Sequence, residues 1–181
     1  PYMGMDSIEP WVSCAESAGK GAFVLMRTSN QGMRDFEYLA VQGDGPAGTP
    51  PRRLYDAVGD KLSALAEAHK GRHGYGAFGV VVGCTEREEA AAIRARRGNL
   101  FFLIPGYGAQ GGAAEDAALL LREGNGGVVN ASRSILRAWT GACASSGLPP
   151  EEAYNRLAAE ASRRALIDIR DAIKKAAAPA S

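Results

Sequence analysis

Polar residues that could bind a ligand lie in four short segments, each directly after an apolar run of strand length. These segments are residues 28–30 (TSN), 84–86 (CTE), 105–112 (PGYGAQGG) and 130–134 (NASRS). If the apolar runs are parallel strands, the segments meet at one rim of the sheet, where ligands of α/β folds gather. Hydroxyls, amides and one arginine then converge there, without a histidine or a pair of carboxylates.

The last two segments together predict a phosphate site. The first of them carries four glycines, Gly106, Gly108, Gly111 and Gly112. Glycines let backbone N–H groups approach an anion closely. Ser132 and Arg133 begin a predicted short helix, SRSILRAW, whose N-terminus favours a phosphate group. We therefore predict that Arg133 binds a phosphate; the alternative is that the glycines only mark turns and that Arg133 is a surface charge.

The elements that must position these residues follow from the apolar pattern. Continuous apolar runs are typical of parallel strands buried on both faces, and they occur at residues 21–27, 76–83, 100–104 and 127–130. Helices are predicted at residues 6–18, 53–68, 85–97 and 113–122, and from Pro149-Pro150 to about Lys175. Strands that alternate with helices predict an α/β protein with a parallel sheet and right-handed crossovers.

Details of these helices give further expectations. Asp6 with Glu9, and Thr85 with Glu88, have the spacing of capping boxes that open helices. In the last helix a stripe of apolar residues is predicted to face a core: Leu157, Ala161, Ala165 and Ile169. A Gly- and Pro-rich insertion at residues 30–52 separates the first strand from its helix, and segments of this kind are often functional or mobile. The sequence leaves open whether residues 40–52 close over a ligand.

Composition excludes several classes of protein. With 21 basic and 20 acidic side chains the net charge is +1, which gives no electrostatic basis for binding nucleic acid or a membrane surface. No apolar run reaches the ~18–20 residues of a membrane span. The odd number of widely spaced cysteines, Cys14, Cys84 and Cys143, predicts small buried hydrophobes in a reducing, cytoplasmic compartment. No metal site is predicted, because only His69 and His73 are present.

Five segments, in the same order and over nearly the whole chain, resemble orotidine 5′-phosphate decarboxylase of the bacterial type-2 subfamily. They are PYMG at 1–4, FVLMRTSN at 23–30, VVGCT at 81–85, FLIPGYGAQGG at 102–112 and VVNASRSI at 128–135. The resemblance implies a (β/α)8 TIM barrel. It also implies decarboxylation of orotidine 5′-phosphate to uridine 5′-phosphate (UMP) in pyrimidine synthesis, without a metal or organic cofactor.

The resemblance also implies roles for individual residues. Arg133 is similar to the arginine that holds the substrate phosphate, and Gly108 and Gln110 are similar to the residues that cover it. Ser29 is similar to the serine that hydrogen-bonds the pyrimidine ring. The remaining expected binding residues are Thr28, Asn30, Gly106 and Ser132.

The chain departs from the family at the reaction centre. The family's D-x-K-x-x-D motif, which precedes the Pro-Tyr-Met-Gly segment, does not occur in these 181 residues. A complete barrel has about 250 residues. We therefore expect residues 1–178 to form the C-terminal half of one barrel domain, strands five to eight with their helices, and residues 179–181 to form a frayed tail. No catalytic residue is then expected in this chain, which alone would be inactive.

The expected partners are a nucleotide substrate, a missing N-terminal half and a second copy in a homodimer. An isolated half-barrel would expose two strand edges and one apolar sheet face. Two alternatives remain: a non-catalytic half-barrel that binds phosphate ligands, and another barrel decarboxylase that acts on phosphosugars.

Overall fold

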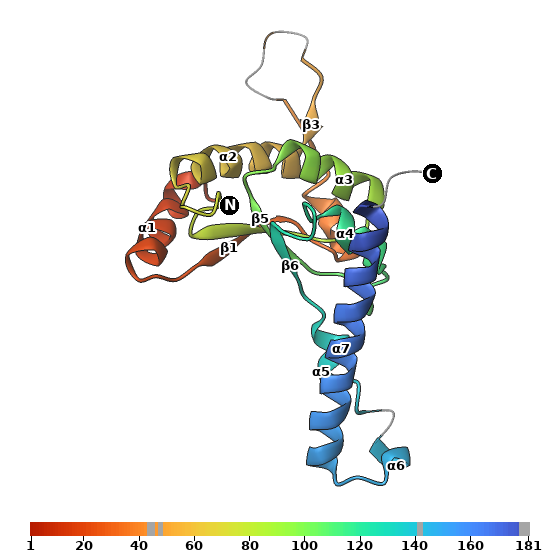
Figure 1. Ribbon diagram of the computed structural model, residues 1–181. Helices are drawn as coiled ribbons and strands as arrows, with labels where there is room; N and C mark the ends of the chain where they lie inside the picture. The colour runs from red at the N-terminus through yellow and green to blue at the C-terminus, as the bar shows by residue number, and fades with distance from the viewer. Residues whose placement is uncertain (43–45, 47–48, 141–142, 178–181) are drawn as a thin grey trace.

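The computed structural model describes residues 1–42, 46, 49–140 and 143–177. Within them, a parallel sheet with the order β1-β4-β5-β6 forms the centre of the protein (Figure 1). Its strands are β1 (Ala22–Arg27), β4 (Phe78–Val82), β5 (Phe101–Ile104) and β6 (Gly127–Val129). The four predicted strands and their parallel arrangement are therefore confirmed. Because all four run the same way, the loops that follow them meet at one rim.

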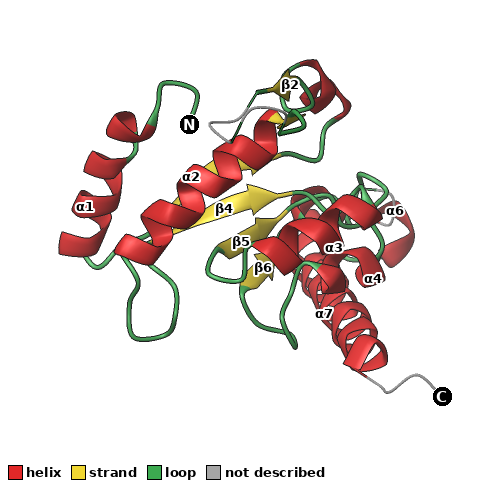
Figure 2. Ribbon diagram, turned by 90° about the horizontal axis from the view of Figure 1, so that it is seen from above, coloured by secondary structure: helices red, strands yellow, loops and turns green. Residues whose placement is uncertain are grey.

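Helices connect the strands and cover one face of the sheet. The α-helices are α1 (Glu9–Ser17), α2 (Leu54–Ala68), α3 (Arg87–Arg96), α4 (Ala114–Leu119), α5 (Ser132–Leu136), α6 (Cys143–Ser146) and α7 (Pro150–Ala177). Two short 3-10 helices are η1 (Met5–Ser7) and η2 (Gln31–Asp35). Figure 2 shows α2 and α3 lying across the sheet on the same side. All five residues of the central strand β4 are buried, and Phe78, Val80 and Val82 share a core cluster with Leu62 and Leu65 of α2 and Ile93 of α3.

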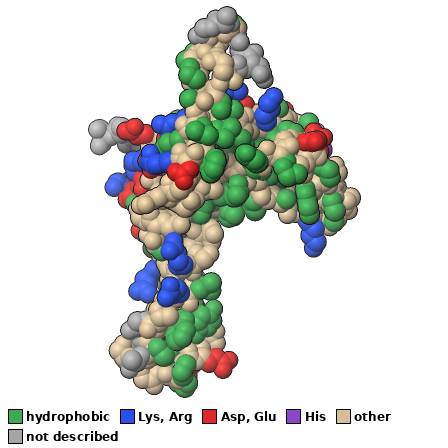
Figure 3. Space-filling model, turned by 180° about the vertical axis from the view of Figure 1, so that it is seen from behind, with side chains coloured by type: hydrophobic (Ala, Val, Ile, Leu, Met, Phe, Trp, Pro, Cys, Tyr) green, Lys and Arg blue, Asp and Glu red, His purple; other side chains and the backbone are tan. Residues whose placement is uncertain are grey.

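The opposite face of the sheet is open. On β1, Phe23 and Leu25 are 45% and 56% exposed, and Val128 on β6 is 46% exposed, whereas Met26 is buried against the helices. The prediction that all strands are buried on both faces is therefore wrong for β1 and β6. Figure 3 shows hydrophobic side chains gathered over the sheet-bearing body of the molecule. The expected apolar face is present, and within the described residues β1 and β6 each have one edge without a partner strand.

A buried arginine of α3, Arg94, joins the elements at the amino ends of β5 and β6. Its guanidinium lies 3.5 Å from the centre of the Phe102 ring. It donates hydrogen bonds to main-chain oxygens of Arg97, Leu100, Leu120 and Gly126. Burial lowers the pKa of Arg94 to about 10, so the side chain is still charged at neutral pH. Sequence patterns did not indicate this role.

The predicted capping boxes are absent at the observed helix starts. Helix α1 begins at Glu9, after a separate 3-10 turn, because Pro10 has no N–H and fits only the first turn of a helix. Helix α3 begins at Arg87 without a side-chain cap. The Thr85 hydroxyl instead lies 3.5 Å from a guanidinium nitrogen of the buried Arg27.

The long helix α7 packs along α4 and α5, and its first turns project beyond the sheet together with α5 and α6 (Figure 1). The predicted core stripe is only half-buried, and the buried residues of α7 are Ala153 and Ala172. The stripe prediction is wrong in this respect because α7 packs on other helices and not on the sheet. The predicted frayed tail at 179–181 lies outside the described residues. No helix in the described part of the chain combines the length and apolarity needed to cross a membrane.

The insertion after β1 forms η2 and a small antiparallel pair, β2 (Ala40–Val41) with β3 (Arg52–Arg53). Figure 1 shows this pair rising from the start of α2, on the side of the helices and away from the sheet. Half of the Gly- and Pro-rich part at 42–51, namely residues 43–45 and 47–48, lies outside the described residues. The described part is hydrogen-bonded to the start of α2, where the amides of Leu54 and Tyr55 donate to the main-chain oxygens of Leu39 and Glu37.

The three cysteines are free, and only one of them matches the prediction fully. Cys84 is completely buried, whereas Cys143 is partly buried and Cys14 is exposed on α1. The prediction of a small buried hydrophobe is therefore correct for Cys84 and wrong for Cys14.

Candidate functional site

A cavity of about 180 Å³ lies at the carboxyl ends of the strands, between the loops that follow β1, β5 and β6. It is lined by Ser29, Pro105, Gly106, Tyr107, Ala109, Gln110, Asn130, Ala131, Ser132, Arg133 and Ser134. Ser29, Gly106, Gln110, Ser132 and Arg133 were all expected from the sequence. The fold thus brings together residues that are up to 104 positions apart in the chain.

The charge of this cavity comes from one side chain, Arg133. No carboxylate is among the lining residues, and no described residue forms an ion pair or hydrogen bond with the Arg133 guanidinium. A planar guanidinium without a carboxylate partner has five N–H donors to offer a phosphate group. The helix that begins at Ser132 ends at Leu136 and is shorter than predicted. The side chain of Arg133, and not a long helix, is therefore the main feature that favours an anion.

The glycines of the 105–112 loop act differently from the prediction. The amides of Gly108, Gly111 and Gly112 all donate to carbonyl oxygens inside the loop, at 2.9–3.0 Å. They shape the loop and are not available to an anion. The amides of Ala109 and Gln110 have no acceptor among the described residues, and both residues line the cavity. These two amides are free backbone donors on the 105–112 loop.

Two loops meet across the cavity through a hydrogen bond. The hydroxyl of Ser29, after β1, donates to Oε1 of Gln110, after β5, at 2.7 Å. The intervening strand β4 ends beside Gly83, and an added Cβ there would lie 2.7 Å from the Cβ of Ser29. Gly106 has a φ of +103° and also adjoins Ser29. Glycine at these two positions therefore allows Ser29 to approach Gln110.

Thr28 and Asn30 do not line the cavity, and their expected role in binding stays a prediction. The Thr28 amide donates to Oε2 of Glu37 at 3.0 Å, and its hydroxyl lies 2.8 Å from Oε1 of the same carboxylate. The Thr28 hydroxyl also lies 2.8 Å from Oδ1 of Asn30. Both side chains are therefore engaged beside the cavity and leave Ser29 as the residue that faces it.

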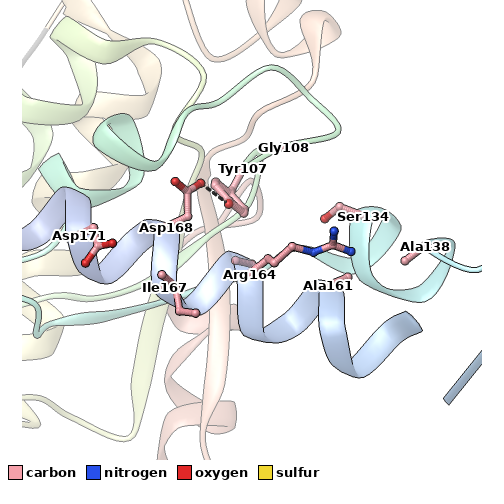
Figure 4. Close-up of a pocket in the computed structure, with 10 residues that line it drawn as sticks. Tyr107, Gly108, Ser134, Ala138, Ala161, Arg164, Ile167, Asp168 and Asp171 are labelled. Atoms are coloured by element: carbon pink, nitrogen blue, oxygen red, sulfur yellow. Dashed lines mark hydrogen bonds between the residues drawn. The ribbon is translucent and has the colours of Figure 1, made fainter. Parts of the chain in front are cut away.

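Gly108 lies at a second, larger cavity of about 670 Å³ between the 105–112 loop, α5 and α7 (Figure 4). Gly108 is absent from the lining of the smaller cavity, and its expected role in covering the phosphate stays a prediction. Tyr107 and Ser134 line both cavities. The Tyr107 hydroxyl donates to Oδ2 of Asp168 at 2.6 Å. Burial and this carboxylate raise the pKa of Tyr107 to about 12, so its proton is retained at neutral pH.

No metal cluster is present in the described part of the chain: no three His, Cys, Asp or Glu side chains are placed to hold an ion. The thiol of Cys84 lies below the 105–112 loop, close to Gly112. Burial raises the pKa of Cys84 to about 11, so the thiol stays neutral and is a poor nucleophile. The site is therefore suited to binding, through one cation, two amides and several hydroxyl and amide side chains.

Comparison with known proteins identifies the family. Residues 1–144 match the sequence model described as the Orotidine 5′-phosphate decarboxylase / HUMPS family. The chain belongs to this family. An orotidine 5′-phosphate decarboxylase of Clostridium perfringens is 48% identical over 176 residues, which are 97% of this chain and 55% of the relative. The chain thus spans about half the length of the curated relatives it matches.

Solved structures of orotidine 5′-phosphate decarboxylases support the same fold. A Toxoplasma gondii protein, solved as a candidate member, gives a TM-score of 0.67 at 27% identity and covers 96% of this chain and 57% of that one. The Leishmania donovani decarboxylase gives 0.55 at 33% identity, with 92% and 55% covered. These solved structures are (β/α)8 barrels. The four strands of this chain and their helices therefore form part of a (β/α)8 barrel, as predicted.

Three polar residues that line the cavity belong to the predicted polar segments but were not among the individual binding residues expected from the sequence. Asn130 lines the cavity and accepts a hydrogen bond from the Ser132 hydroxyl at 2.9 Å. Ser134 and Tyr107 line it as well. Their position in the two loops that carry the resemblance was the signal that could have found them. Glu37 had no such signal, because it lies in the insertion.

Proposed function

We propose that this chain supplies the nucleotide-binding part of an orotidine 5′-phosphate decarboxylase, a carboxy-lyase of pyrimidine synthesis that forms UMP and CO₂. Arg133, with the free amides of Ala109 and Gln110, binds the substrate phosphate. Ser29 hydrogen-bonds the pyrimidine ring beside Gln110. One observation carries this proposal: Arg133 has no ionic partner among the described residues and lies in a cavity whose lining contains no carboxylate and which the Ser29–Gln110 hydrogen bond crosses.

The chemical step needs residues that these 181 do not contain, because the D-x-K-x-x-D motif is absent from them. We propose that further strands, from another segment of the protein, bring this motif to the open rim and close the barrel. Its lysine would supply the proton that replaces CO₂, and its aspartates would destabilise the substrate carboxylate. The exposed Phe23, Leu25 and Val128 support this closure, as do the edges of β1 and β6, which have no partner strand in the part of the chain that the structure describes.

Binding at the phosphate contributes to the reaction even though the phosphate does not react. Interactions with a remote part of a substrate can be used to orient and destabilise the reacting group. Arg133 would therefore increase the rate of decarboxylation by binding the substrate phosphate. The proposal also includes a homodimer in the cytoplasm, where its free cysteines would stay reduced. The mass of the native assembly tests the dimer.

The test is calorimetric titration of the chain with UMP, ribose 5-phosphate and inorganic phosphate. Arg133→Ala is expected to weaken UMP binding on the order of 10- to 100-fold, because charge-assisted hydrogen bonds contribute roughly 1.5–3 kcal/mol. Arg137→Ala is the matched control, since Arg137 directly follows the same helix and is absent from the cavity lining. Its UMP affinity is expected to stay within twofold of that of the unmodified chain.

Each other outcome has a definite meaning. Equal weakening by both variants would assign the effect to general charge and would contradict the role of Arg133. Equal affinity for ribose 5-phosphate and UMP would favour a phosphosugar substrate over a nucleotide. No binding of any of the three compounds by the chain would refute the proposal that these residues bind the nucleotide.

A further inference from the structure

Glu37 makes two contacts with Thr28, the residue directly before Ser29. One carboxylate oxygen accepts the main-chain N–H of Thr28 at 3.0 Å, and the other lies 2.8 Å from the Thr28 hydroxyl. Hydrogen bonds to an ionised acceptor are stronger than those between neutral groups. This double contact fixes both the backbone and the side chain of Thr28. Ser29 follows directly and has little freedom to move away from the cavity.

Glu37 is itself fixed by the surrounding backbone. Its main-chain N–H donates to the oxygen of Met33 at 2.8 Å, and its main-chain oxygen accepts the N–H of Tyr55 at 3.1 Å. Met33 is buried, and Tyr55 belongs to α2. The carboxylate therefore extends from a segment that is anchored to the helical layer. It is a firm support and not a mobile side chain on a free loop.

A second carboxylate, Glu89 of α3, secures the same region from the other side. It accepts the Tyr38 hydroxyl at 2.6 Å and pairs with the buried Arg27 at 3.2 Å and with Arg53. Arg27 precedes Thr28 and also donates to the main-chain oxygen of Gly83 at 3.0 Å. The insertion and the end of β1 are thus joined through α3. Tyr38, next to Glu37, and Arg27, next to Thr28, are therefore both bound to Glu89.

We propose that Glu37 is a positioning residue that holds Ser29 in the cavity through Thr28. The inference rests on the proposed function, because it assigns Glu37 to the pyrimidine end of the nucleotide site and not to the phosphate end. Glu37 does not line the cavity, so it acts only through its neighbours. The insertion after β1 then serves as a support behind the binding loop.

The first test compares binding of UMP and of inorganic phosphate by calorimetry. Glu37→Ala is expected to weaken UMP binding about 5- to 20-fold and to leave phosphate affinity within twofold. Glu37→Gln is expected to restore UMP affinity to within threefold, because a carboxamide oxygen can accept the Thr28 N–H and its NH₂ can donate to the hydroxyl. Asp35→Asn is the control, since it removes one exposed carboxylate from the adjacent η2.

Unchanged UMP affinity in Glu37→Ala, or equal loss of UMP and phosphate affinity, would overturn the inference. A second measurement needs no ligand: hydrogen–deuterium exchange of the Thr28 and Ser29 amides, followed by NMR. Glu37→Ala is expected to speed exchange at Thr28 at least tenfold, and Asp35→Asn is not. If the unmodified chain binds neither probe, the proposed function fails, and the exchange rates still decide the positioning role: equal rates in the two variants would refute it.

Discussion

Gly83→Ala adds a methyl group directly after β4, at the position that adjoins Ser29. An added Cβ would lie 2.7 Å from the Cβ, 2.8 Å from the Cα and 2.9 Å from the N of Ser29, where ordinary contacts are 3.4–4 Å. Ser29 must therefore retreat by roughly 0.7 Å to restore an ordinary contact. Such a shift is enough to stretch the hydrogen bond to Gln110 from 2.7 Å beyond the usual range for two oxygens.

The expected cost has two parts that different assays separate. Overpacking is expected to lower the free energy of unfolding by about 1–3 kcal/mol, measured by urea denaturation. Loss of the Ser29–Gln110 geometry is expected to weaken UMP binding about fivefold, measured by calorimetry, because one net hydrogen bond is worth about 1 kcal/mol. Phosphate affinity should not change, since the lost contact involves the side chain of Gln110, whereas Arg133 and main-chain amides bind the phosphate in the proposed site.

Gly32→Ala is the matched control for this change. There the added Cβ would meet only the Asn30 side chain, at 3.4 Å, which is an ordinary contact. We expect its stability and its UMP affinity to equal those of the unmodified chain. A folded Gly83→Ala protein that binds UMP as tightly as the unmodified chain would refute the link between Gly83, Ser29 and the nucleotide.

Two further predictions concern parts of the structure away from the Ser29 contact. Gly59→Ala places a Cβ against Nε of the buried Arg97, and we expect a loss of about 2–3 kcal/mol in urea unfolding; unchanged stability would show that Arg97 can move. The folded-state pKa of Tyr107, about 12, lies above the ordinary 10, so its stabilising contribution is complete below pH 10 and is lost as pH rises towards 12. Tyr107→Phe should remove this part of the alkaline loss of stability, measured by urea unfolding at pH 8 and pH 11, and an identical loss in both proteins would contradict the assignment.

Local sequence patterns were sufficient for the strands and for the position of the site. The apolar run at residues 76–83 marked β4, because every residue of that strand is buried and a continuous run results. The rim rule for parallel strands then placed Ser29, Gln110 and Arg133 together, as the cavity lining confirms. These inferences depend only on strand order and direction, which neighbouring residues largely determine.

Features set by distant partners could not be predicted in this way. The carboxylate of Glu37 makes two contacts with Thr28, yet Glu37 lies in an insertion that has no regular sequence pattern. Thr85 has the spacing of a helix cap, but the fold places it against the buried Arg27. Gly108 lies in a glycine-rich loop of the kind that binds anions, but its amide already donates a hydrogen bond to the main-chain oxygen of Gly112. In each case a partner elsewhere competes with the local preference.

The buried guanidinium of Arg94 has a consequence for how the protein unfolds. It donates hydrogen bonds to the main-chain oxygens of four residues in different segments. Arg97 follows α3, Leu100 precedes β5, Leu120 follows α4 and Gly126 precedes β6. If any one of these segments opened alone, a buried charged donor would lose its acceptor, at a cost of several kcal/mol. We expect these segments to open as one cooperative unit, so the two loops that carry Gln110 and Arg133 stay on a common support until that whole unit opens.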